Sequence, residues 1–185
     1  MGYGFRFSTA RDLFDAFPTA GEDMRAAPTD QPSLTFCRSL VASRIPEEAI
    51  TFCAYLLPGR VAVWWGHECL VQLSSALNEQ DFRMLALVHG WVSDPSEYRR
   101  FVVLDEALAA EERTPAVWIA LAAGWSEAPG ASNGQAQMHS RTARALNTGI
   151  LAGLARVALA DRAPALTDFV AMGMQLAEFE ASRLS

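Results

Sequence analysis

The sequence lacks lysine, and all 15 of its basic residues are arginine. This absence excludes a Walker-type phosphate-binding lysine, Schiff-base chemistry and a lysine general base. The net charge is −6, and the arginines form no basic run or stripe along the chain. Because binding to nucleic-acid phosphates depends on such a stripe, we expect no nucleic-acid partner.

Cysteine is also scarce. Cys37, Cys53 and Cys69 form an odd set without a CxxC pair, and each lies in an apolar helical pattern. A secreted disulfide framework needs a denser, even set, so we predict buried thiols in a reducing compartment. The N-terminus has no uninterrupted apolar stretch of the signal-peptide type, and no charge-free apolar segment reaches the length of a membrane span. We therefore expect a cytoplasmic protein without membrane insertion.

The common catalytic motifs are missing: GxSxG, HExxH, GxGxxG and a phosphate-binding loop. The nearest cluster of reactive residues is His67, Glu68 and Cys69. Consecutive helical residues point in different directions, so these side chains cannot chelate a metal as an i, i+4 pair would. We predict a non-catalytic protein with no metal and no cofactor.

What the sequence does contain is a strong helical pattern. Proline stands where a first helical turn would begin, at Pro46, Pro95, Pro115 and Pro164, and Asp94 with Glu97 suggests a capping box. The segments between them repeat apolar residues at intervals of three and four, and alternation typical of strands is absent. We predict an all-α fold: a single multi-helix bundle of about eight short-to-medium helices in stacked antiparallel pairs.

Two segments depart from this pattern. Residues 1–32 combine an amphipathic segment with a polar, proline-punctuated linker from residue 18 onward, so we place the all-helical domain at residues 33–185. Residues 127–140 are rich in small polar residues and are predicted to form a mobile loop.

Two adjacent tryptophans lie in the segment "GRVAVWWGHECL". On an ideal helix Trp65 belongs to a continuous apolar arc and should be core. Trp64 lies in the complementary arc with Arg60, His67 and Glu68. Either a second helix of the chain covers Trp64, or it belongs to an interaction surface.

Small residues recur four apart in the last two predicted helices: Ala145, Gly149 and Gly153 in one, Gly173, Ala177 and Ala181 in the other. Such stripes allow helix backbones to approach closely. We predict that these two helices pack against each other, with a homodimer through Ala145, Gly149 and Gly153 as the alternative.

Three blocks carry a resemblance: "AVWW" at residues 62–65, "WVSDPSEYRR" at residues 91–100 and "TPAVWIALAAGWS" at residues 114–126. They resemble the motifs of an uncharacterised bacterial family of small all-helical proteins, often encoded near type VI secretion genes. The likeness spans about residues 46–181. The chain departs from that pattern at Gly59 and Val61, where arginine and glutamate are expected, and after Ser126. The resemblance implies a cellular context but no activity.

We therefore hypothesise a helical protein-interaction module, an accessory or adaptor protein of a type VI secretion system. Tryptophan and arginine are the residue types that most often anchor interfaces. The predicted partner-binding residues are Arg60, Trp64, His67, Glu68, Arg99 and Arg100.

Two alternatives stay open. The first is an enzyme or small-ligand binder with an inter-helix pocket closed by the 127–140 loop, for which Glu127, His139 and Arg141 are the nearest polar candidates. The second is an immunity or inhibitor protein, for which the net charge of −6 would suit a basic partner.

Overall fold

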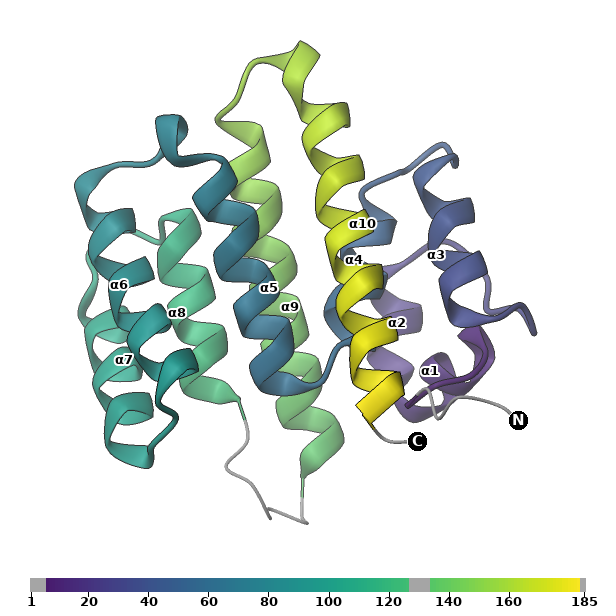
Figure 1. Cartoon of the computed structure of the whole chain (residues 1–185), viewed down its shortest axis with the longest axis horizontal. Helices are drawn as coiled ribbons and strands as arrows, with labels where there is room; N and C mark the ends of the chain where they lie inside the picture. The colour runs from purple at the N-terminus through teal and green to yellow at the C-terminus, as the bar shows by residue number, and fades with distance from the viewer. Residues whose placement is uncertain (1–5, 127–133, 184–185) are drawn as a thin grey trace.

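The computed structural model describes residues 6–126 and 134–183, and these residues form an all-α bundle (Figure 1). They contain no β-strand, and an isolated antiparallel bridge joins Thr9 to Pro32. The predicted fold class is confirmed, with more short helices near the N-terminus than expected. The helices of the described residues are α1 Ala10–Ala16, α2 Pro18–Asp23, α3 Ser33–Val41, α4 Glu48–Leu56, α5 Gly59–Gln72, the 3-10 turn η1 Ser74–Ala76, α6 Glu79–Ser93, α7 Glu97–Ala109, α8 Pro115–Trp125, α9 Gln135–Ala155 and α10 Leu159–Arg183.

The two longest helices, α9 and α10, form an antiparallel hairpin that divides the molecule (Figure 1). Helices α1–α4 lie on one side of this hairpin, α6–α8 lie on the other, and α5 crosses in front of α9. The side chains of α8 are almost all buried, which its near-continuous apolar sequence "PAVWIALAAGW" explains. The core is one hydrophobic cluster that runs through both sides of the bundle.

Helix boundaries follow the proline pattern at Pro115 and depart from it at Pro95 and Pro164. Pro115 lies in the first turn of α8, as predicted. Helix α7 begins after Ser96, whose hydroxyl accepts a hydrogen bond from the Arg99 N–H, so Asp94 is not the capping residue. Pro164 lies inside α10 rather than at its start, because the chain reverses earlier, at residues 156–158.

Arg162 stabilises this earlier reversal. Its guanidinium donates hydrogen bonds to the carbonyl oxygens of Ala155 (2.9 Å) and Val157 (3.2 Å) at the end of α9. The last carbonyls of a helix have no intrahelical donor, so a cation here supplies both hydrogen bonds and favourable charge. The proline pattern could not show this, because the partner groups come from the preceding helix.

The small-residue stripes pack inside the chain, but not against each other. A Cβ on Gly149 would lie 2.8 Å from the Pro115 carbonyl oxygen of α8, and one on Gly173 would lie 3.1 Å from the Trp65 Nε1 of α5. Ala145, Gly149 and Gly153 are all buried. The predicted α9–α10 contact through the stripes is therefore wrong, and a homodimer through these residues would require the bundle to open.

The segment predicted as a polar linker is packed against the helical domain. Residues 18–23 form α2, and Ala20 and Met24 belong to the common hydrophobic cluster. The buried Glu48 carboxylate accepts hydrogen bonds from the backbone N–H groups of Arg25 (2.5 Å) and Ala26 (3.2 Å). No local sequence pattern could show this burial, because the hydrogen-bond partners of Glu48 lie more than twenty residues away in the chain.

The core positions read from the tryptophan segment are confirmed. Trp65 is fully buried, and its indole N–H donates to the Phe169 carbonyl oxygen of α10 at 2.8 Å. All three cysteines are buried free thiols, with the Cys37 and Cys53 sulfurs 3.5 Å apart. No helix in the described part of the chain has the length and apolar character needed to cross a membrane.

Candidate functional site

A surface groove of about 380 Å³ lies between α5, α6 and α10, and Trp64 forms one of its walls. We call it the tryptophan groove. Its opposite wall comes from the C-terminal half of α10, where Phe179 is 59% exposed. The groove is lined mainly by apolar side chains: Arg60, Val61 and Trp64 from α5, Val92 and Ser93 from α6, and Leu176, Phe179 and Glu180 from α10.

Trp64 is held in place by two histidines. Its ring stacks on His67, one helical turn along α5, with centroids 5.3 Å apart and planes 11° apart. His89 of α6 lies at the edge of the same cluster, 6.0 Å from Trp64 and 5.7 Å from His67. The stacking partner of Trp64 is therefore a histidine. The indole is partly buried, and these ring contacts fix its orientation.

The structure brings together only part of the predicted contact set. Arg60 and Trp64 line the tryptophan groove. His67 is 6% exposed and lies behind Trp64, with its Nδ1 2.9 Å from the Glu68 carboxylate, so it supports the surface without forming it. Glu68 is partly exposed beside that imidazole.

Arg99 and Arg100 lie on α7 and take part in contacts that hold this helix in the bundle. The Arg99 guanidinium pairs with Asp94 at 3.2 Å. The Arg100 guanidinium is largely buried and donates to the Gly124 carbonyl oxygen of α8 at 2.9 Å. These two arginines anchor α7 to its neighbours, so the groove's cation is Arg60.

Sequence reasoning missed the α10 side of the groove. Leu176, Phe179 and Glu180 lie more than a hundred residues after Trp64, and no local pattern connects them with it. One signal was present: Leu176 and Phe179 fall beside the stripe of Gly173 and Ala177. Large apolar residues next to a small-residue stripe indicate a second apolar face on α10.

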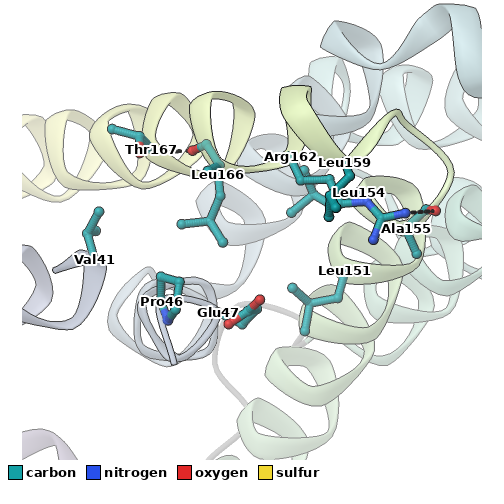
Figure 2. A pocket seen from close by; sticks show the side chains of 11 residues that line it. Val41, Pro46, Glu47, Leu151, Leu154, Ala155, Leu159, Arg162, Leu166 and Thr167 are labelled. Carbon is teal, nitrogen blue, oxygen red and sulfur yellow. Dashed lines mark hydrogen bonds between the residues drawn. The ribbon is translucent and has the colours of Figure 1, made fainter. Parts of the chain in front are cut away.

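A second groove, of about 450 Å³, lies at the opposite end of α10, near the α9–α10 reversal (Figure 2). We call it the hinge groove. Figure 2 shows Pro46, Glu47 and Leu151 on one side of the hollow, with Leu159, Arg162 and Leu166 on the other. Most of its lining is apolar, and Glu47 and Arg162 are its charged members.

The structure describes only part of the segment 127–140 that was predicted to close a pocket. Residues 127–133, including Glu127, lie outside the described residues, and residues 135–140 are the first turns of α9 instead of a loop. His139 is buried and hydrogen-bonds to the Tyr55 carbonyl oxygen (2.8 Å), while Arg141 stacks over Trp125 with its Cζ 4.0 Å from the ring centroid. Both polar candidates are engaged in packing contacts.

Both grooves are lined mainly by apolar side chains, with one arginine and one glutamate in each, and the tryptophan groove adds two aromatic rings. Across residues 6–126 and 134–183, no group of three histidine, cysteine or carboxylate side chains is arranged to hold a metal ion. Burial raises the thiol pKa of Cys53 and Cys69 well above the ordinary value; hydrogen bonding to Cys37 is the larger cause for Cys53. The Cys53 and Cys69 thiols are thus poor nucleophiles.

No curated protein and no solved structure matches the chain. One sequence family does match, over residues 36–177, and it is described as a family of unknown function, DUF6931. This match covers most of the described helices, from α3 into α10, and includes the α5 and α6 walls of the tryptophan groove together with Leu176. The chain therefore belongs to the DUF6931 family.

Proposed function

We propose that the protein is a helical interaction module that docks an apolar segment of a partner protein in the tryptophan groove. The observation that carries the proposal is that Trp64 of α5 and Phe179 of α10 both line one open apolar groove. Phe179 exposes 59% of its surface, whereas most large apolar side chains of the described residues are buried in the core. Exposed aromatic walls around a groove are typical of sites that receive apolar anchors from a partner.

Charge in the groove favours a partner segment with opposite charges on its two sides. Arg60 lies on the α5 side and Glu180 on the α10 side, so the two sides of a docked segment meet opposite charges. An amphipathic helix with one or two apolar anchors, an acidic residue near Arg60 and a basic residue near Glu180 satisfies both walls. The net charge of −6 is not concentrated here, which favours an adaptor over an inhibitor of a strongly basic protein.

The cellular context we propose is that of an accessory or adaptor protein of a type VI secretion system. The support for this context is the resemblance of the three sequence blocks around Trp64, Trp91 and Trp118. A partner from the secretion apparatus would supply the apolar segment.

The proposal is tested by affinity purification of the tagged protein from its native cells, comparing three variants with the wild type. Phe179→Ala is the cleanest groove variant, because the side chain is mostly exposed and its loss costs little stability. Trp64→Ala removes the other wall, with a modest decrease in melting temperature because the indole stacks on His67. Both variants should lose the same captured protein.

Tyr98→Ala is the matched control. Tyr98 is an aromatic residue on α7, 78% exposed and outside the tryptophan groove. The control variant should retain the partner at wild-type level. Loss of the partner in all three variants, or retention in both groove variants, would show that this groove is not the docking site.

A further inference from the structure

We propose that the hinge groove is a self-association site, in which a second copy of this chain inserts its Leu159 into the groove while its own groove receives Leu159 in return. This interface is separate from the tryptophan groove and from its proposed partner. Two features of the surface carry it: an apolar projection beside an apolar hollow, and opposite charges on the two sides of that hollow.

The first feature is the shape of the surface. Leu159 begins α10 and is 78% exposed, more than any other leucine among the described residues. It stands at the edge of a hollow of about 450 Å³ whose walls include Val41, Leu151 and Leu166. A projection and a hollow in one patch satisfy the requirement of a two-fold interface, in which each surface must complement itself.

The second feature is charge. Glu47 lies on the α4 side of the hollow and Arg162 on the α10 side (Figure 2). A two-fold rotation about an axis near the groove brings Glu47 of one copy toward Arg162 of the other, and it does so twice. A patch with one acid and one base on opposite walls is thus complementary to its own copy, whereas a uniformly charged partner would meet one repulsion.

Leu159 is also held in a fixed position at the α9–α10 reversal. Arg162 fixes the α9–α10 reversal through two backbone carbonyls, so Leu159 is held on a rigid corner. A preorganised projection loses little conformational entropy on docking. One groove per copy is a small contact, so we expect a weak dimer that forms at high protein concentration.

Sedimentation equilibrium of the full chain over a concentration series up to about 1 mM tests the proposal. The wild type should pass from 20.1 kDa toward twice that mass. Leu159→Arg and Glu47→Arg should each weaken the dimer by about tenfold or more, because each places an unmatched charge in the contact. Leu108→Arg, at an exposed leucine of α7, is the matched control and should dimerise like the wild type.

Circular dichroism and thermal melts separate lost contacts from damaged folding. Because Leu159 and Glu47 are exposed, Leu159→Arg and Glu47→Arg should keep the helical signal and the melting temperature of the wild type while they lose the dimer. A wild-type chain that stays monomeric at all concentrations would overturn the proposal. So would a dimer that Leu159→Arg leaves intact, or an equal loss in Leu108→Arg.

Discussion

Acidification should destabilise the fold through one residue, His139. The imidazole lies 6% exposed on α9, stacked on Phe17 with ring centroids 4.5 Å apart. Its Nε2 is 2.8 Å from the Tyr55 carbonyl oxygen, which only accepts, so Nε2 carries the proton in the neutral ring. Acidification must therefore protonate Nδ1 inside the core.

Burial of the imidazole, together with the positive charge of Arg6, lowers the pKa of His139 from 6.5 to about 4. The unfolded chain binds the proton at its ordinary pKa, so the unfolded state gains protons first as the pH falls. Stability is therefore complete above pH 6.5 and is lost as the pH drops toward 4. Since one pKa unit corresponds to about 1.4 kcal/mol, the loss amounts to about 3 kcal/mol.

Urea denaturation monitored by far-ultraviolet circular dichroism, at pH values from about 7.5 to 4, measures this loss. Because carboxylates also titrate near the lower limit, the wild type is compared at each pH with His139→Gln, whose amide donates to the same carbonyl but does not titrate. The stability difference between the two proteins should change by about 3 kcal/mol over the range. A difference that stays constant with pH, or an NMR titration of His139 near pH 6.5, would refute the reasoning.

Two further substitutions test the packing. Asp81→Asn should lower the free energy of unfolding by about 2–4 kcal/mol in urea denaturation, because the fully buried carboxylate accepts from the Ala116 N–H (3.0 Å) and from Arg156 (2.6 Å); a loss below about 0.5 kcal/mol would contradict this. Gly149→Ala should destabilise by about 1–2 kcal/mol, since its methyl group would meet a backbone carbonyl of α8, whereas Gly90→Ala, which meets only a flexible arginine side chain, should stabilise by about 0.5–1 kcal/mol. Thermal melts of both glycine variants check the opposite signs, and equal shifts would refute the assignment.

Local patterns predicted the elements that depend on local physics. The Thr114–Pro115 pair marked the start of α8, because a proline at a helix start loses no hydrogen bond. The apolar arc of the segment at residues 59–70 identified Trp65 as core, since a helix buries one face against its neighbours.

Contacts between residues far apart in the chain determine the features that the local patterns did not predict. Pro164 lies inside α10 because Arg162 reaches back to α9 and places the reversal earlier. The segment predicted as a linker at residues 18–32 is packed against the domain, because Glu48 accepts a hydrogen bond from its backbone and because Ala20 and Met24 join the core. Of the predicted contact residues, only Arg60 and Trp64 line the tryptophan groove, because its other wall comes from α10.

The sequence by itself determined an all-helical chain, the burial of Trp65 and the three cysteines, and two arcs on the helix that carries the tryptophans. The tertiary structure alone decided what each face meets: α8 against Gly149, α5 against Gly173, and α10 across the groove from Trp64. The reason is that periodicity and capping act over one or two turns. The partner of a helix face depends on contacts between residues far apart in the chain, which no short window contains.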